Sequence, residues 1–199
     1  KAVRFAQENE VAFDVTSLRS AYSTRVGDVL EDQFHDESIR PRPLRVGILG
    51  LGTVGLGTYR HLSKFPSVKV TRIAVRDLQK ANDNGAPTGI LTNNAVTVLQ
   101  DDCDVLIELI GGIEPALTLV RAALDAGKHV ITANKSLMAR HGVELQEIAD
   151  QRGVRLLFSG AVGGGVPMIE TVRHLAQDHS IESIEGVLNG TCNFILDKT

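Results

Sequence analysis

The sequence predicts an α/β fold in which a doubly wound parallel sheet is followed by the beginning of a second, α+β domain. From Leu44 onward, apolar segments typical of buried strands alternate with helix-forming segments, and this order favours a parallel sheet covered by helices on both faces. After Ser159 the alternation stops, and a glycine cluster, a helix-forming run and a stretch of alternating apolar and polar residues follow. We therefore expect one complete domain and part of another.

The expected elements follow the apolar segments in order. Residues 68–75 are rich in β-branched side chains, which favour a strand. The helix over residues 115–126 starts with Pro115, whose fixed φ suits a first turn, and stops before Gly127, a typical C-cap glycine. Residues 82–89, rich in Asn, Gly, Pro and Asp, predict a loop. We expect strands at 44–49, 68–75, 104–110, 128–132 and 154–158, helices at 53–64, 115–126 and 142–152, and then a helix at 168–177 and a strand with one exposed face at 181–188.

Three regions are expected along the chain. Residues 1–43 mix charged residues with short apolar clusters and end in Arg-Pro-Arg-Pro, which predicts an N-terminal extension and a stiff linker. Within them, apolar residues at helical spacing over 26–34 predict a short amphipathic helix. Residues 44–159 would form the sheet domain, and residues 160–199 would begin a substrate and dimerisation domain.

The composition argues against several classes of protein. The formal net charge is −3, and without a basic excess the chain is a poor partner for nucleic acid or an anionic membrane surface. No apolar run approaches the roughly 20 residues needed to cross a bilayer. Cys103 and Cys192 have neither the spacing of metal ligands nor the density of a disulfide framework, which suits a reducing cytoplasm. We therefore expect a cytoplasmic protein with a small-molecule ligand.

Three glycines mark the turn after the first strand of the sheet. Gly50, Gly52 and Gly55 lie in G-x-G-x-x-G spacing between this strand and a helix-forming run, which is typical of a Rossmann-type dinucleotide-binding turn. Gly50 would permit the tight turn, Gly52 the close approach of a pyrophosphate, and Gly55 the close packing of the helix. The helix N-terminus would then face the phosphates. An ordinary strand-to-helix turn is the alternative.

The residues that close the second strand bear on the choice of nicotinamide cofactor. An acidic residue about 20 positions after the glycines binds the ribose hydroxyls of NAD, whereas a nearby arginine accommodates the 2′-phosphate of NADP. Here Arg76 comes first, and its planar guanidinium suits a phosphate. Asp77 follows and leaves NAD open, unless it caps the next turn. We favour NADP, with NAD and a pair of solvated surface charges as the alternatives.

A polar Asn-Lys pair follows the apolar strand over residues 128–132. Ligands of open α/β sheets bind at the carboxyl ends of the strands, which is where Asn134 and Lys135 are expected. The lysine could donate hydrogen bonds to a cofactor ribose or a substrate oxygen, or take part in proton transfer. A surface lysine in a loop is the alternative.

Five segments, taken in order, resemble the homoserine dehydrogenase family. Together they extend over residues 44–199 and leave residues 1–43 outside the resemblance. The segments are residues 50–55 (GLGTVG), 108–115 (ELIGGIEP), 132–135 (TANK), 162–169 (VGGGVPMI) and 186–196 (GVLNGTCNFIL).

This resemblance implies an oxidoreductase that interconverts L-homoserine and L-aspartate 4-semialdehyde with a nicotinamide cofactor. It also implies a cytoplasmic homodimer that serves threonine and methionine biosynthesis. The glycine turn would hold the pyrophosphate, Arg76 the adenosine end, and Lys135 would be the catalytic lysine beside the nicotinamide and the substrate. The cofactor-binding residues that the resemblance implies are Gly50, Gly52, Thr53, Val54, Gly55, Arg76, Gly111, Gly112 and Lys135.

The resemblance also implies a sodium ion held by backbone carbonyls of Val162, Gly164 and Val166. Here the sequence departs from the family pattern, which reads Phe-Glu-Ala-Ser-Val just before this loop. Ser159 stands in the position of the glutamate, so a hard cation would lose its charged protein ligand. We therefore expect this metal site to be impaired.

The family's remaining substrate-binding acidic residues and its second lysine follow the matched Asn-Gly-Thr segment, and the chain ends at Thr199. We therefore expect an incomplete fragment that binds cofactor without normal turnover. Two alternatives stay open at this point. One is a related dehydrogenase of another small aldehyde, ketone or amino acid, because fold alone does not determine substrate. The other is a non-catalytic dinucleotide-binding sensor or regulatory module.

Overall fold

A computed structural model describes residues 13–16, 23–26, 42–164, 166–178, 180–186 and 198. The chain divides into two compact units, residues 1–41 and 42–199. In the first unit, strand β1 (Phe13–Thr16) pairs antiparallel with β2 (Ser23–Val26). Val26 therefore ends a strand, and the rest of the helix expected over 26–34 lies outside the described residues.

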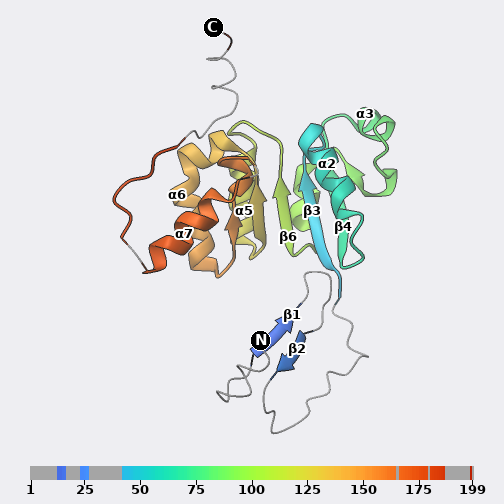
Figure 1. The fold of residues 1–199 in the computed structure, drawn as a ribbon. Helices are drawn as coiled ribbons and strands as arrows, with labels where there is room; N and C mark the ends of the chain where they lie inside the picture. Colours follow the sequence, from blue (N-terminus) through green and yellow to red (C-terminus); the bar gives the residue numbers. More distant parts are fainter. Residues whose placement is uncertain are drawn as a thin grey trace. The chain divides into compact units, whose positions relative to one another are not determined.

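The second unit is built on a six-stranded parallel sheet with the strand order β5-β4-β3-β6-β7-β8, and helices flank it (Figure 1). The predicted α/β fold class is confirmed. The strands are β3 (Leu44–Leu49), β4 (Val68–Ala74), β5 (Leu91–Thr92), β6 (Val105–Glu108), β7 (His129–Thr132) and β8 (Leu156–Leu157). The helices are α2 (Thr53–Leu62), α3 (Leu78–Asp83), α4 (Ala95–Gln100), α5 (Ala116–Asp125), α6 (Lys135–Arg152) and α7 (Met168–Asp178), with 3₁₀ turns η1 (Thr88–Ile90) and η2 (Ser159–Ala161).

The order of the strands places a topological switch point beside β3. The chain leaves β3 through α2 to reach β4 on one side, and later returns to β6 on the other side of β3. The connections therefore diverge at the carboxyl end of β3. In open α/β sheets this divergence opens the crevice in which ligands bind.

Alternating side chains along the strands build an apolar core on each face of the sheet. Val46 and Ile48 of β3 belong to one core, against which Tyr59 and Leu62 of α2 pack. The other core holds Leu106, Val130 and Leu156 from the strands together with side chains of α5 and α6. Helix α5 carries a broad apolar stripe and buries Ala116, Leu117, Leu119, Val120, Ala123 and Leu124.

Helix α6 begins seven residues before the expected position 142, which corrects the sequence prediction. The Asn134 side chain accepts a hydrogen bond from the amide of Leu137 at 3.1 Å and so caps the helix. Lys135 is therefore the first residue of a helix and not part of a loop. The helix ends at Gly153, whose φ of +66° is the left-handed conformation of a glycine C-cap.

Short helices replace part of the expected loop structure. Asp77 and Asn94 each cap a helix that the sequence analysis did not identify, α3 and α4 respectively, by accepting backbone amide hydrogen bonds. As a result, α3 and η1 take up parts of the loop expected over 82–89. These helices have only six residues each, too few for a helical periodicity to stand out.

Three expected strands differ from the structure by more than one residue, and the one expected over 154–158 is shortened to β8. Strand β6 ends at Glu108 instead of residue 110, because the amides of Ile110 and Gly111 bind the Glu108 carboxylate and leave the sheet ladder. Of the strand expected over 181–188, residues 181–186 form no strand, and 187–188 lie outside the described residues. An alternating pattern becomes a strand only beside a partner, and none of the described strands pairs with this segment.

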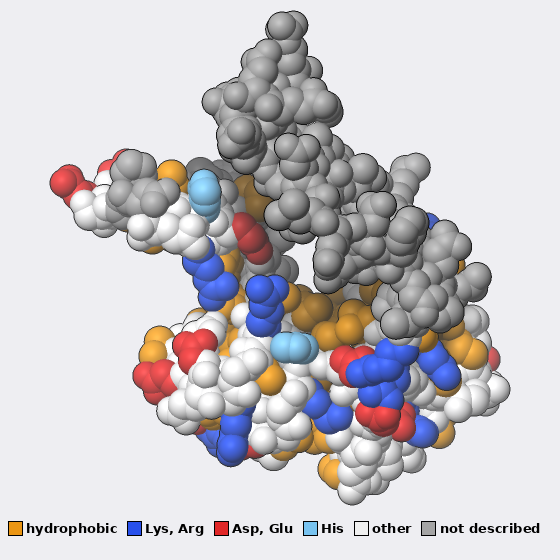
Figure 2. All heavy atoms as spheres, turned by 90° about the horizontal axis from the view of Figure 1, so that it is seen from below, with side chains coloured by type: hydrophobic (Ala, Val, Ile, Leu, Met, Phe, Trp, Pro, Cys, Tyr) orange, Lys and Arg blue, Asp and Glu red, His pale blue; other side chains and the backbone are white. Residues whose placement is uncertain are grey.

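A charged cluster ties together the segments that lead into β3 and β6. The Asp104 carboxylate accepts hydrogen bonds from both terminal nitrogens of Arg42, at 2.8 and 2.9 Å, and from the backbone amide of Arg45 at 2.9 Å. These donors hold the pKa of Asp104 well below its usual range. Figure 2, which views the molecule from the end where β3 begins, shows basic and acidic side chains side by side.

We expect Asp104→Asn to lower the free energy of unfolding by about 1 kcal/mol at pH 7, because it removes a carboxylate that four donors of Arg42 and Arg45 stabilise. Since the folded-state pKa is depressed, the contribution is complete above the unfolded pKa of about 4 and declines as the pH falls below it. Urea unfolding at pH 7 and pH 3 measures both effects. Asp125→Asn, which breaks the exposed Arg152 pair, is the control and should change little. An equal loss at both pH values would contradict this account.

Helix α2 packs so closely on the turn before it that only glycine fits at position 55. A Cβ added to Gly55 would lie 2.2 Å from the carbonyl oxygen of Gly50. A Cβ added to Gly57, two residues further along the same helix and exposed, would meet nothing within 4 Å. The two glycines therefore have opposite steric surroundings.

This contrast predicts opposite effects of two identical substitutions. Gly55→Ala should destabilise the chain by about 2 kcal/mol or more, because backbone must move to admit the methyl group. Gly57→Ala should stabilise it by about 0.5–1 kcal/mol through higher helix propensity. Thermal or urea unfolding of the two variants decides the matter, and destabilisation by both in equal measure would refute the packing argument.

Candidate functional site

The turn between β3 and α2 has the geometry that the glycine spacing predicts. Gly50 has a φ of +95°, and its amide donates to the carbonyl oxygen of Ala74 at 2.9 Å. A Cβ added there would lie 2.7 Å from the carbonyl oxygen of Leu109. Glycine is therefore required at position 50 both by conformation and by space.

The N-terminus of α2 is open at the position where a phosphate would bind. Gly52 is the N-cap, provides no side-chain cap, and a Cβ added to it would meet nothing within 4 Å. The exposed residues Thr53 and Val54 begin the helix, and no acidic residue lies in its first turn. The first amides of the helix thus keep their hydrogen-bonding capacity. The open cradle that results fits a dinucleotide pyrophosphate.

Arg76 and Asp77 lie just after the carboxyl end of β4, and their side chains differ in the hydrogen bonds that they make. Asp77 caps α3 by accepting a hydrogen bond from the amide of Lys80 at 3.0 Å. Arg76 is exposed and makes no hydrogen bond or ion pair with the described residues. The guanidinium is therefore available to a ligand, whereas one carboxylate oxygen of Asp77 is already engaged.

The loop after β6 contains Gly111 and Gly112, both with positive φ values of +79° and +75°. Both glycines are exposed at the carboxyl end of β6, next to the end of β3. The loop is held from below by Glu108, which is completely buried and whose carboxylate accepts the amide of Ile110 at 2.8 Å. The sequence analysis did not assign Glu108 to the site, although a carboxylate that ends an otherwise apolar strand is a detectable signal.

Lys135 starts α6 at the carboxyl end of β7, and its side chain is exposed. A cation in the first turn of a helix faces the positive end of the helix dipole, which is locally unfavourable by a few tenths of a kcal/mol. A residue that conflicts with its local structure in this way is a candidate for a functional role. The glycine turn, Gly111–Gly112 and Lys135 thus follow three neighbouring strands, β3, β6 and β7.

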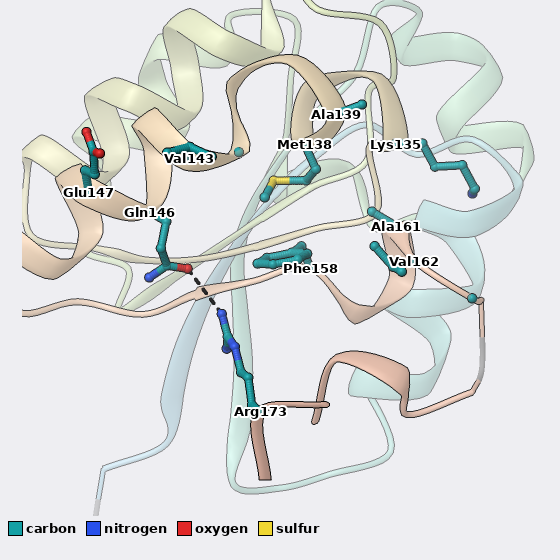
Figure 3. Close-up of a pocket in the computed structure, with 12 residues that line it drawn as sticks. Lys135, Met138, Ala139, Val143, Gln146, Glu147, Phe158, Ala161, Val162 and Arg173 are labelled. Carbon is teal, nitrogen blue, oxygen red and sulfur yellow. Dashed lines mark hydrogen bonds between the residues drawn. The ribbon is translucent and has the colours of Figure 1, made fainter. Parts of the chain in front are cut away.

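Lys135 also lines a cavity of about 700 Å³ between α6, η2 and α7 (Figure 3). Met138, Phe158 and Val162 give this cavity an apolar surface, while Arg173 contributes a second cation. The Arg173 guanidinium carbon lies 5.5 Å from the centroid of the Phe158 ring, and its Nη2 donates to Gln146 at 3.3 Å. Apart from Lys135 and Val162, the sequence analysis did not identify the residues that line this cavity, because only tertiary packing brings them together.

The segment implied in sodium binding follows η2. Ser159 donates a hydrogen bond to the Glu170 carboxylate, which lowers the pKa of Glu170 below its usual value. The Val166 carbonyl oxygen accepts the amide of Met168 at 2.8 Å, whereas Val162 and Gly164 lie in the bend before it. No cluster of three or more His, Cys, Asp or Glu side chains suited to a metal occurs in the described part of the chain. The predicted sodium site rests on backbone carbonyls and stays a prediction.

Two protein-family models match the chain. A family model described as "Homoserine dehydrogenase, NAD binding domain" matches residues 50–159, more than half of the chain. A second model, "Homoserine dehydrogenase", matches residues 167–199. Among the described residues, none of the helices has the length and apolar character required to span a bilayer.

Individual relatives agree with the family models. The homoserine dehydrogenase of Synechocystis sp. is 39% identical over 163 residues, which are 78% of this chain and 38% of the relative. That of Pseudomonas aeruginosa is 40% identical over 166 residues, 79% of this chain and 38% of the relative. The crystal structure of a homoserine dehydrogenase from Thiobacillus denitrificans is 43% identical with a TM-score of 0.72, over 79% of this chain and 38% of that chain. The chain spans about two fifths of the length of these proteins, and it belongs to the homoserine dehydrogenase family.

Proposed function

We propose that the chain binds NADP along the carboxyl ends of β3, β6 and β7, with the nicotinamide directed toward Lys135. We propose further that the protein interconverts L-homoserine and L-aspartate 4-semialdehyde. The observation that carries the proposal is the open cradle at Gly52, built at the topological switch point of the sheet. Membership of the homoserine dehydrogenase family supports the substrate.

The proposed preference for NADP rests on the two residues after β4. Arg76 is exposed without a partner among the described residues, so its guanidinium can bind the 2′-phosphate in a bidentate manner. Asp77, which would select NAD by binding the ribose hydroxyls, has one of its two carboxylate oxygens engaged by the Lys80 amide. NAD remains the weaker alternative.

The bound nicotinamide would supply or accept a hydride at the carbonyl carbon of the substrate. In the direction of reduction, the Lys135 ammonium group would donate a hydrogen bond to the carbonyl oxygen and deliver the proton there. In the direction of oxidation, the neutral Lys135 amine would take the proton from the substrate hydroxyl. The adjoining cavity offers an apolar surface for a short aliphatic chain and, at Arg173, a cation for a carboxylate. Gly111 and Gly112 would let the backbone approach the cofactor closely.

We also propose, from the family resemblance, a cytoplasmic homodimer that serves threonine and methionine biosynthesis. A sodium ion at Val162, Gly164 and Val166 is the weakest part of the proposal, because Ser159 offers a hydroxyl that is engaged with Glu170. Domain limits of 44–159 for cofactor binding and 160–199 for the start of the substrate domain belong to the same proposal.

Side-by-side titration of the chain with NADPH and NADH tests the cofactor. We expect NADPH to bind at least about tenfold more tightly, and Arg76→Ala to remove most of this preference by weakening NADPH alone. Lys69→Ala, which removes an exposed cation from β4 but lies away from the carboxyl edge, is the matched control. Binding of neither cofactor by the unmodified chain would overturn the proposed function.

Replacement of Lys135 by alanine in the full-length protein tests the catalytic role. Turnover of homoserine with NADP should fall by about 10²–10⁴-fold, since a group that handles the proton is lost, while the Kd for NADPH changes little. Lys64→Ala, at an exposed position after α2, should leave both quantities unchanged. Unchanged turnover in the Lys135 variant would exclude it as a catalytic residue, and an unmodified protein without homoserine oxidation would favour a non-catalytic binding module.

A further inference from the structure

A buried carboxylate lies directly beneath the proposed nicotinamide end of the site. Glu108 has no exposed surface, although it ends a strand at the ligand-binding edge of the sheet. Its Oε1 accepts the amides of Ile110, at 2.8 Å, and Gly111, at 3.3 Å. Its Oε2 accepts the hydroxyl of Thr132 at 2.5 Å. One side chain thus holds backbone of the β6 loop and a side chain of the neighbouring strand β7.

The hydroxyl of Thr132 links Glu108 to the start of α6, because it forms hydrogen bonds on both sides. Its Oγ1 accepts the amide of Asn134 at 3.0 Å, so its own proton is free to bind Glu108. The Asn134 side chain leads back to the β6 loop, because its Nδ2 donates a hydrogen bond to the Gly112 carbonyl oxygen. Its Oδ1 caps helix α6. Thr132 and Asn134 are both buried.

These contacts form a closed ring of hydrogen bonds through the ends of two adjacent strands. One side of the ring fixes Gly111 and Gly112, and the other fixes Asn134, the residue directly before Lys135. A neutral or apolar residue at position 108 could not accept hydrogen bonds from three donors at once. A buried carboxylate is costly unless it is fully hydrogen-bonded, so this ring is sensitive to the loss of any member.

We propose that Glu108 is a positioning residue, which acts through Thr132 and Asn134 to align the glycine loop with the start of α6. In this way the nicotinamide half of the cofactor and Lys135 are held in register. The inference rests on the proposed cofactor function. The proposal predicts different effects on the two halves of the cofactor, because the Gly52 cradle and Arg76 at the adenosine end are not part of the ring.

The test uses Thr132→Val, which keeps the shape of the side chain but removes the hydroxyl, and Thr132→Ser, which keeps the hydroxyl. The Kd is measured for NADPH and for 2′,5′-ADP, which lacks the nicotinamide half. We expect Thr132→Val to weaken NADPH binding about tenfold with the 2′,5′-ADP affinity nearly unchanged, and Thr132→Ser to restore most of the loss. Val130→Ala, which creates a cavity at a buried position of the same strand, is the control for general destabilisation.

A loss of affinity shared equally by both ligands, or one reproduced by Val130→Ala, would overturn the positioning role. Hydrogen exchange of the ligand-free chain provides a second readout. Thr132→Val should speed exchange at the amides of Gly111 and Asn134 while Ile48 in β3 stays protected, and unchanged exchange at both sites would also overturn the proposal. If the unmodified chain binds neither ligand, the proposed cofactor function fails, and the exchange data still decide whether the ring couples the two loops.

Discussion

The close approach of helix α2 to the turn before it is the constraint on which the rest of the site depends. Because Gly55 has no side chain, the helix can start within van der Waals distance of the Gly50 carbonyl group. This start leaves the first helical amides facing an open space at Gly52 instead of a side-chain cap. The sheet topology then places this space at the divergence of the chain on either side of β3. A local steric condition thus produces the open cradle in which we propose that the pyrophosphate binds.

The ends of the next two strands extend this site in one direction. Strand β6 ends early because the Glu108 carboxylate accepts hydrogen bonds from the amides that follow the strand. Strand β7 is followed almost directly by helix α6, because Asn134 caps that helix. The same ring of hydrogen bonds connects both events. Buried, hydrogen-bonded residues therefore hold the Gly111–Gly112 loop and the start of the helix that carries Lys135. A binding site with defined geometry requires such buried residues behind it.

The sequence was sufficient for the parts of the fold that depend on local pattern. The apolar run over 44–49 and the glycine spacing predicted β3, its turn and the start of α2, because Gly50 and Gly55 meet steric requirements of the turn. The start of α6 was predicted wrongly, since residues 135–141 lack a clear apolar stripe and only the Asn134 cap decides where the helix begins. The contact of Arg173 with Phe158 depends on tertiary packing that no local pattern encodes. Glu108, by contrast, could have been recognised as the carboxylate that ends an otherwise apolar strand.

The crystal structure of the chain grown with saturating NADPH is the most direct measurement of the central claim. The account predicts pyrophosphate oxygens at about 3 Å from the amides of the first turn of α2, above Gly52, with the nicotinamide toward Lys135. A cofactor bound elsewhere on the molecule, with the Gly52 cradle filled only by solvent, would contradict it.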